Sequence, residues 1–245
     1  MSTQIVIIPT YNEKENISAM LEKVLSLPVK FDILIVDDGS PDGTGAIVKS
    51  YQTKNPEQIH LIERAGKQGL GTAYITGFKK CIELGYDYIF EMDCDFSHNP
   101  DDLLRLLEAC QNQGADVAVG SRYVNNLVNV VNWPMGRVLL SYFASMYVRW
   151  VTRMKIMDTT AGFVCYKRIV LETMNLDEIK FKGYAFQIEM KFTAIKCGFK
   201  VEEVAIIFTD RTKGTSKMSS GIIKEAFWGV IQLKVSSWFK KYPAA

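Results

Sequence analysis

The sequence predicts an α/β protein whose mostly parallel sheet is covered by helices on both faces. In the first half of the chain, short apolar runs alternate with segments that have the apolar spacing of helices. This alternation is typical of parallel strands joined by crossover helices. Acid-containing segments follow several of the apolar runs, at the carboxyl ends of the expected strands, where sheets of this kind bind their ligands.

The elements of the first half follow one another in a regular order. Apolar runs predict strands over residues 5–8, 33–36, 59–62, 86–90 and 117–119. Helices are expected over residues 13–27, after the turn at 37–44, from the turn at 69–73 to residue 84, and over 103–109. The first helix has an i, i+3, i+4, i+7 stripe made of Ile17, Met20, Leu21, Val24 and Leu25. Pro9 is expected to end the first strand.

The second half is less regular. It predicts helices over 134–155, 185–196 and 222–242, strands over 163–166 and 200–208, and a long polar loop over 211–220. Because we find no internal repeat, low-complexity tract or linker, we expect a single domain over residues 1–245.

The composition argues against several classes of protein. The 29 Lys and Arg nearly balance the 27 Asp and Glu, so no strong field points to nucleic acid. The five cysteines are odd in number and lack metal-site spacing, which indicates reduced thiols in a cytoplasmic protein. We expect no secretory leader, and no run approaches the roughly 18 apolar residues that span a bilayer.

Two aspartates follow the fourth predicted strand. Asp93 and Asp95 are one residue apart, so their side chains can share one face of the strand end. Carboxylates this close repel each other unless a positive charge lies between them. A hard divalent cation, Mg²⁺ or Mn²⁺, takes such ligands and leaves positions for water and phosphate. The alternative is a helix-capping aspartate with a solvated neighbour at a strand-to-helix turn.

Seven motifs, in order along the chain, resemble the inverting glycosyltransferases of family 2, which have the GT-A fold. They are Pro9-Thr10-Tyr11-Asn12-Glu13, the segments 37–44, 69–74, 93–98, 120–123 and 186–190, and Arg211-x-x-Gly214-x-Ser216-Lys217. The last two resemble the polyprenyl-phosphate (dolichol-phosphate) mannose synthases of the short type, without a transmembrane extension. The resemblance covers Ile5 to about Ser220. It departs at Cys94, where the family often has Ala and where we expect the side chain to point away from a metal.

The resemblance implies that different segments of the chain bind the donor and the acceptor. Residues 1–123 would form a nucleotide-sugar-binding half, residues 124–220 an acceptor-binding half, and residues 221–245 an amphipathic C-terminal helix. Tyr11 could stack on the nucleotide base, Asp38 would read the base, and Lys67 would neutralise the donor's phosphates. The other donor-binding residues that it implies are Pro9, Glu13, Val36, Asp93, Cys94, Asp95 and Arg122.

The same resemblance implies a metal and a set of phosphate-binding cations. Asp93, Asp95 and Ser97 would hold Mg²⁺ or Mn²⁺, which neutralises charge on the leaving nucleotide. His98 is expected to be structural, since imidazole suits other metals. The residues expected around the lipid phosphate are Arg122, Arg137, Lys182, Arg211 and Lys217. The expected catalytic residues are Asp95, Arg211 and Lys217.

Most of these residues also have a plainer interpretation. Asp37 and the glycines near it are explained by turn geometry, and Glu13 by the first turn of a helix. Glu189 could orient sugar hydroxyls or pair with a nearby lysine, and Asp158 is expected to shape the site. The polar loop around Gly214 would close over the donor. For the apolar helices over 134–155 and 222–242, core packing, a dimer interface and a membrane surface all remain open.

The expected function is therefore inverting, metal-dependent transfer of a hexose to a polyprenyl phosphate. Mannose from GDP-mannose is the preferred donor, and a peripheral position on the cytoplasmic face of a membrane is expected. One alternative is another nucleotide sugar, such as UDP-glucose, with the same acceptor. A different alternative is a non-catalytic subunit that binds nucleotide sugar or lipid phosphate. A homodimer or a small membrane partner subunit is left open, and no nucleic acid is expected.

Overall fold

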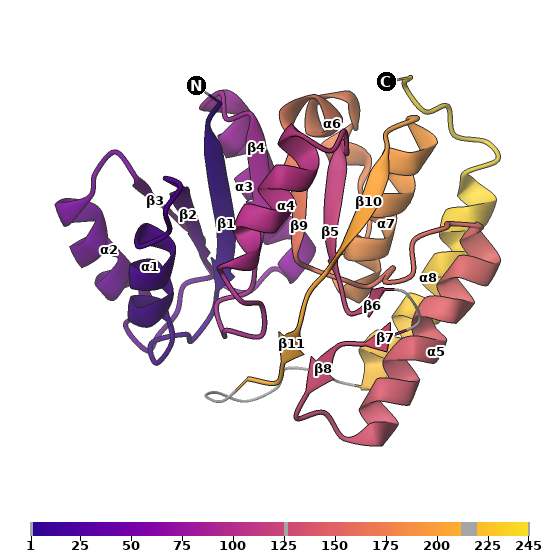
Figure 1. Ribbon diagram of the computed structural model, residues 1–245, viewed down its shortest axis with the longest axis horizontal. Coiled ribbons are helices and arrows are strands. Elements are labelled where there is room, and N and C mark those ends of the chain that lie inside the picture. The colour runs from indigo at the N-terminus through magenta and orange to yellow at the C-terminus, as the bar shows by residue number, and fades with distance from the viewer. Residues whose placement is uncertain (1, 125–126, 212–219, 245) are drawn as a thin grey trace.

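The computed structural model describes residues 2–124, 127–211 and 220–244 (Figure 1). A seven-stranded sheet runs through its middle in the order β10-β5-β9-β4-β1-β2-β3. These strands are β1 (Gln4–Thr10), β2 (Asp32–Asp37), β3 (Ile59–Glu63), β4 (Tyr88–Glu91), β5 (Val117–Ser121), β9 (Val164–Lys167) and β10 (Val201–Ala205). Among the described residues, neighbouring strands are parallel except where β9 meets β4 and β5. The mostly parallel sheet predicted from the sequence is confirmed.

Helices cover both faces of the sheet. On one face, α1 (Ile17–Leu25), α2 (Thr44–Lys54) and α4 (Asp102–Gln111) contribute to one apolar core. On the other face, α3 (Leu70–Glu83), α6 (Arg168–Thr173) and α7 (Tyr184–Lys196) contribute to a second. Strands covered on both faces need apolar side chains at nearly every position, which explains the unbroken apolar runs of β1 and β2.

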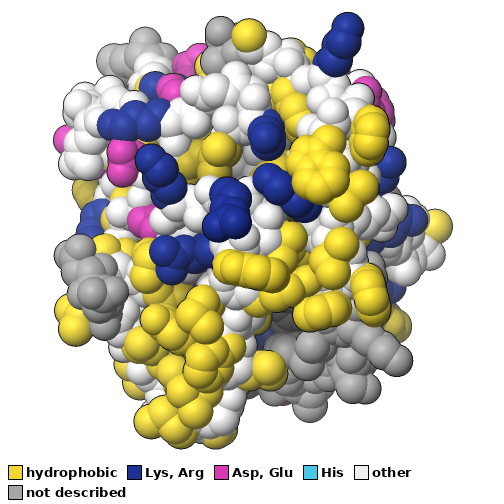
Figure 2. All heavy atoms as spheres, turned by 90° about the vertical axis from the view of Figure 1, so that its right-hand side faces the viewer, with side chains coloured by type: hydrophobic (Ala, Val, Ile, Leu, Met, Phe, Trp, Pro, Cys, Tyr) yellow, Lys and Arg dark blue, Asp and Glu magenta, His cyan; other side chains and the backbone are white. Residues whose placement is uncertain are grey.

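Two further helices lie beside the sheet. α5 (Met135–Thr152) and α8 (Ser220–Ser236) pack against each other, and both contribute to a third core with α7. Figure 1 shows this pair at the right-hand side, and Figure 2 shows the face that it forms, where hydrophobic side chains gather beside Lys and Arg. Among the described residues, no helix is both long enough and apolar enough to cross a membrane.

Short elements connect the sheet to this helix pair. β6 (Tyr123–Val124) pairs with β7 (Leu127–Val128), and β8 (Val130–Val131) pairs with β11 (Phe208–Thr209). A 3₁₀ turn, η1 (Leu176–Glu178), lies between α6 and α7.

The expectation that Pro9 ends the first strand is wrong. β1 continues to Thr10, and Pro9 pairs with Val36 of β2. On its other side, the pairing of β1 with β4 already stops at Ile7. Pro9 therefore lies where only one neighbouring strand needs hydrogen bonds, and a missing N–H is tolerated there.

Two predictions for the end of the chain are also corrected. The single strand expected over 200–208 is divided, because β10 pairs with β5 while β11 leaves the sheet to pair with β8. The closing helix ends at Ser236 rather than at residue 242. Beyond it, Lys240 pairs with Glu178 and the ring of Tyr242 packs edge-on against Phe192, so the tail is held by side-chain contacts instead of helical ones.

The start of α3 gives a test of how closely the core is packed. A Cβ on Gly71 would lie 2.8 Å from the carbonyl oxygen of Phe181 and from the ring of Phe186. We expect Gly71→Ala to destabilise the protein by about 1–3 kcal/mol because backbone must move. On Gly136 of α5 a Cβ would meet nothing within 4 Å. Gly136→Ala should be neutral or stabilise by up to about 1 kcal/mol. Equal urea-unfolding midpoints for the two variants would contradict this packing.

Candidate active site

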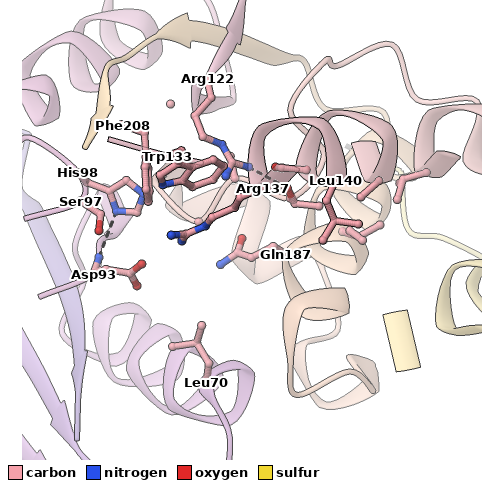
Figure 3. A pocket seen from close by; sticks show the side chains of 18 of the residues that line it. Leu70, Asp93, Ser97, His98, Arg122, Trp133, Arg137, Leu140, Gln187 and Phe208 are labelled. Atoms are coloured by element: carbon pink, nitrogen blue, oxygen red, sulfur yellow. Dashed lines mark hydrogen bonds between the residues drawn. The ribbon is translucent and has the colours of Figure 1, made fainter. Parts of the chain in front are cut away.

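A cavity of about 500 Å³ lies past the carboxyl ends of β4 and β5, between the sheet and the helices α5 and α8 (Figure 3). One wall is polar and mostly basic, made of Asp93, Ser97, His98, Arg122, Arg137, Gln187 and Arg211. The opposite wall is apolar, made of Leu140, Phe143, Tyr147, Val148, Ile188, Phe227 and Val230. The cavity can therefore hold a ligand with an anionic end and an apolar end.

The two aspartates follow β4 rather than belong to it. The strand ends at Glu91, so the alternation of a strand does not place Asp93 and Asp95. Asp93 lines the cavity. Asp95 is buried, with Oδ1 accepting the N–H of Ser97 at 3.0 Å and Oδ2 lying 2.9 Å from Nη2 of Arg211. The structure thus joins one proposed metal ligand directly to one proposed phosphate ligand.

The oxygen donors here fit a hard cation. Asp93 and Ser97 line the cavity, and the Asp95 carboxylate in the same short loop accepts the N–H of Ser97. Among the described residues, no group of three or more His, Cys, Asp or Glu is placed to hold a metal. Two carboxylates would be enough for Mg²⁺ or Mn²⁺, which usually complete their shells with water and substrate phosphate. The metal stays a prediction.

His98 has a packing role, as predicted. Its ring stacks on Phe163 with 4.9 Å between centroids and meets Phe208 edge-on. Nδ1 accepts a long hydrogen bond of 3.4 Å from the N–H of Asp93. Burial lowers the pKa of His98 to about 4, so the neutral ring is the form that supports Asp93 at neutral pH.

Arg122 is held by a buried ion pair. Its Nε and Nη2 each lie 2.7 Å from an oxygen of Asp158, and its backbone N–H donates to the same carboxylate. Nη2 also donates to Thr160, and Glu203 accepts the N–H of Asp158. Three aromatic rings, those of Tyr123, Trp133 and Phe208, surround the guanidinium at 5.4–5.6 Å. Arg122 is thus fixed at the cavity wall, and Asp158 shapes the site as expected.

Arg137 comes from the first turns of α5. Its Nη1 donates to both carboxylate oxygens of Asp210, at 2.9 and 3.0 Å. Its guanidinium lies 4.2 Å from the ring centroid of Trp133, a cation–π contact. Figure 3 shows Arg137 reaching into the middle of the cavity beside Trp133. Arg122, Arg137 and Arg211 therefore meet at one cavity, as the resemblance implies.

The segments after β1 and β2 form a second region at the same sheet edge. Asp37 accepts hydrogen bonds from Thr10 and from the N–H and hydroxyl of Ser40, so it holds the turn, as expected. Asp38 pairs with Arg64, whose Nε lies 2.6 Å from Oδ1. Because both side chains are nearly buried, this pair fixes the Asp38 carboxylate in place.

The remaining donor residues lie around this region. The ammonium of Lys67 lies 5.6 Å from the ring centroid of Tyr11, and the N–H of Glu13 donates to Thr44. The side chains of Val36 and Cys94 are buried in the two cores. Cys94 therefore points away from the cavity, as expected, and these two residues can offer a donor only their backbone.

Two residues that were expected near the acceptor do not line the cavity. Lys182 is exposed beside the turn at Gly69 and does not line the cavity. Glu189 is also outside the cavity, where Oε2 accepts the N–H groups of Lys180 and Phe181 at 2.9 Å. Lys217, with the loop around Gly214 that was expected to close, lies outside the described residues.

Sequence reasoning missed the partners of the expected residues. Arg64 follows β3 and could have been found as a polar residue at a strand end. Asp210, next to Arg211, and Trp133 carry no local signal, because only the fold brings them to Arg137. The same holds for Glu91 and Lys191, which are charged but wholly buried near the cavity.

The Arg122–Asp158 pair gives a stability prediction. Removing one member leaves the other charge buried and unpaired, so Asp158→Asn should cost about 3–5 kcal/mol of unfolding free energy. Asp177→Asn is the matched control, since its pair with Lys79 is exposed and should contribute less than about 1 kcal/mol. Losses of similar size in the two variants would contradict the assigned role.

The same pair predicts a pH dependence. Burial by itself raises the pKa of Asp158, but Arg122 outweighs it and the net pKa lies below the usual 3.8. A carboxyl with a lowered folded pKa stabilises the protein above its unfolded pKa and loses this contribution as pH falls through the folded value. The difference between wild type and Asp158→Asn, measured by urea unfolding, should be full at neutral pH and shrink only below about pH 4. If the difference in unfolding free energy stayed constant to the lowest pH at which the protein folds, the lowered pKa of Asp158 would be contradicted.

Comparisons with known proteins agree with this architecture. Residues 5–174 match the family described as glycosyl transferase family 2. A polyprenol monophosphomannose synthase of Mycolicibacterium smegmatis is 46% identical, over 96% of this chain and 86% of its own. An undecaprenyl-phosphate mannosyltransferase of Micrococcus luteus is 42% identical, over 92% of this chain and 93% of its own.

A solved structure shares the fold. The glucosyl-3-phosphoglycerate synthase of Mycobacterium tuberculosis, in complex with Mn²⁺ and UDP-glucose, superposes with a TM-score of 0.68 at 15% identity, over 96% of this chain and 78% of its own. From the family match over more than half of the chain, and from relatives above 40% identity, we conclude that this protein belongs to glycosyl transferase family 2.

Proposed function

We propose that this glycosyltransferase moves mannose from GDP-mannose to a polyprenyl phosphate, with inversion at the anomeric carbon. The observation that carries the proposal is the two-sided cavity, with arginines on one wall and apolar helices on the other. A polyprenyl phosphate has the same two ends. The names of the two bacterial relatives, which are a polyprenol and an undecaprenyl-phosphate mannosyltransferase, support this acceptor and this sugar.

The chemistry of the acceptor agrees with the scarcity of carboxylates in the cavity. A sugar or lipid hydroxyl needs a base to remove its proton. Among the described residues that line the cavity, the only carboxylate is Asp93, which we assign to the metal. A phosphate monoester has a second pKa near 6, so it is mostly a dianion at pH 7 and needs no base. It needs alignment with the anomeric carbon and cations that offset repulsion from the anionic donor.

The chain's own residues supply these two needs. Arg122 and Arg137 are held rigidly by Asp158 and Asp210, so they can bind phosphate oxygens without first becoming ordered. Arg211 lines the cavity and pairs with Asp95, so it would offer a cation to the acceptor's phosphate next to the proposed metal ligands. Asp38, fixed by Arg64, would read the base, and Tyr11 and Lys67 would flank the nucleotide. Lys217 is proposed as a further phosphate ligand.

Asp93 and Asp95, with Ser97, would hold Mg²⁺ or Mn²⁺. When bound, this cation would supply Lewis-acid assistance to the departure of the nucleotide diphosphate. Asp95 also forms an ion pair with Arg211. The same carboxylate would therefore bind the metal and position the arginine that contacts the acceptor's phosphate. The solved relative with Mn²⁺ and UDP-glucose supports a divalent metal in this fold.

The membrane surface is the proposed location, because the apolar wall of the cavity is continuous with an exposed apolar face. On α5 and α8 the exposed side chains include Met135, Leu139, Leu140, Phe143, Met146, Trp150, Phe227, Trp228 and Val235, followed by Trp238 and Phe239. α5 contains no acidic residue. In Figure 2 this apolar face borders Lys and Arg side chains, a pattern typical of surfaces that bind anionic lipid headgroups.

The test of the proposal is a transfer assay with purified protein, polyprenyl phosphate, Mn²⁺ or Mg²⁺, and a panel of labelled nucleotide sugars. We expect a polyprenyl-phosphate sugar to form fastest from GDP-mannose. Faster transfer from UDP-glucose would show that the proposed donor is wrong and that the proposed acceptor is right. If the protein binds nucleotide sugar but transfers none of the panel, the chain is a binding subunit instead.

Two variants separate the metal from the phosphate ligands. Asp93→Asn should abolish transfer and metal-dependent GDP binding, because it removes a charged oxygen ligand. Arg211→Ala should lower kcat/KM by about tenfold or more, equivalent to at least ~1.4 kcal/mol of transition-state stabilisation. It should leave metal-dependent GDP binding intact, because the proposed metal ligands Asp93 and Asp95 both remain in this variant. Calorimetry with GDP and Mn²⁺ measures the difference, and loss of metal binding in Arg211→Ala would contradict these roles.

The proposed reaction needs no general base, and a variant of Glu189 tests this point. Because Glu189 accepts backbone N–H groups outside the cavity, Glu189→Gln should keep at least about half of wild-type transfer, with the same pH profile above pH 7. Inactivity that is relieved as pH rises, with both substrates still bound, would identify a base and overturn the mechanism.

A further inference from the structure

A chain of buried polar side chains runs from the end of β4 through α7 to the loop after Asp158. Nε2 of Gln187 donates to Oε2 of Glu91 at 2.8 Å. Nζ of Lys191 donates to the carbonyl oxygen of Ala161 at 2.6 Å and lies 3.4 Å from Oε1 of Gln187. Glu91 and Lys191 are 0% exposed and Gln187 is 3% exposed. The nucleotide, metal and phosphate contacts described above use none of these three side chains.

The two charged residues decide which way the Gln187 amide points. A carboxylate accepts hydrogen bonds and an ammonium only donates them. Turning the amide over would place its oxygen against the Glu91 carboxylate and its NH₂ group against the Lys191 ammonium. The contact between the NH₂ group and the ammonium would then be repulsive. Burial raises the pKa of Glu91 to about 8, and in either protonation state its carboxyl can accept from the amide, so Lys191 and Glu91 together favour one orientation.

Gln187 is the point at which this chain reaches the cavity. It lines the cavity wall, and Figure 3 shows its amide close to Arg137, on the side away from Asp93. A glutamine amide offers two N–H donors and two acceptor positions on oxygen. Glu91 takes one donor and Lys191 one acceptor position, and no other protein partner of this amide is found among the described residues. One donor and one acceptor position are left for a ligand.

We propose that Gln187 contacts hydroxyl groups of the transferred hexose, and that Glu91 and Lys191 are positioning residues that orient its amide. This inference rests on the proposed function. A hydroxyl group both donates and accepts, so it matches an amide that offers one of each. A phosphate dianion only accepts, and the three arginines of the cavity already serve it.

The test compares binding of GDP-mannose with binding of GDP by calorimetry in the presence of Mn²⁺. Gln187→Leu should raise the dissociation constant of GDP-mannose by about five- to tenfold, which corresponds to the loss of one or two hydrogen bonds. The dissociation constant of GDP should not change. GDP serves as the internal control, because a general loss of folded protein lowers both signals. Gln111→Leu is the matched control: Gln111 is exposed and bonds to Ser2 at the opposite end of the sheet, so neither affinity should change.

Two further variants test the positioning role. Lys191→Met and Glu91→Gln should each reduce the preference for GDP-mannose over GDP, and neither should reduce it further in a Gln187→Leu background. Glu91→Gln keeps the shape of the side chain, so it remains informative should Lys191→Met fail to fold. Additive losses in the double variants would show that Glu91 and Lys191 act independently of Gln187 and would overturn the positioning role.

Failure of the inference and failure of the proposed function give different results. If wild type prefers GDP-mannose to GDP and Gln187→Leu keeps that preference, Gln187 does not contact the sugar. If wild type transfers no mannose from GDP-mannose but uses another nucleotide sugar of the panel, the proposed donor is wrong, whatever the binding of the Gln187→Leu variant.

Discussion

The buried ion pair of Arg122 and Asp158 is the interaction on which the acceptor side of the site depends. The carboxylate receives the backbone N–H of Arg122 as well as two guanidinium hydrogen bonds, and Glu203 in turn holds the backbone of Asp158. The Asp158 carboxylate thereby fixes the end of β5, the loop before β9 and the Arg122 guanidinium at the cavity wall. A site built to bind an anion needs positive groups that are already ordered, because cations ordered only on binding would lose side-chain entropy at that step.

The cavity has a charged wall and an apolar wall, which match the charged and apolar ends of a lipid phosphate. Asp93, Arg122 and Arg211 follow strands, as ligand-binding residues do in other parallel sheets, while Arg137 and most of the apolar wall come from helices beside the sheet. The carboxylates that accompany the arginines, Asp158 and Asp210, do not line the cavity themselves. The pairing therefore orients each guanidinium, and arginines outnumber carboxylates among the charged residues that line the cavity, which suits an anionic acceptor.

Much of this fold could be predicted from the sequence, because apolar strands covered on both faces and amphipathic helices such as α1 leave clear periodic patterns. The expected strand ends indicated the region of the aspartates, and the family resemblance added the arginines to it. What could not be predicted depends on contacts between distant segments. Pro9 continues a strand because β4 has already ended beside it, and residues 200–208 divide between two sheets. Glu189 could have oriented sugar hydroxyls, and only the fold shows that it holds a backbone turn instead.

The central claim is that the acceptor brings its own negative charge, so that the protein supplies cations and no base. The most direct measurement compares two acceptors with the same lipid chain, polyprenyl phosphate and the free polyprenol, at pH 7 with GDP-mannose and metal. The account predicts transfer to the phosphate and none detectable to the alcohol, whose hydroxyl would remain protonated at this site. Comparable transfer to the alcohol would contradict the account, because it would require a base that the described cavity does not contain.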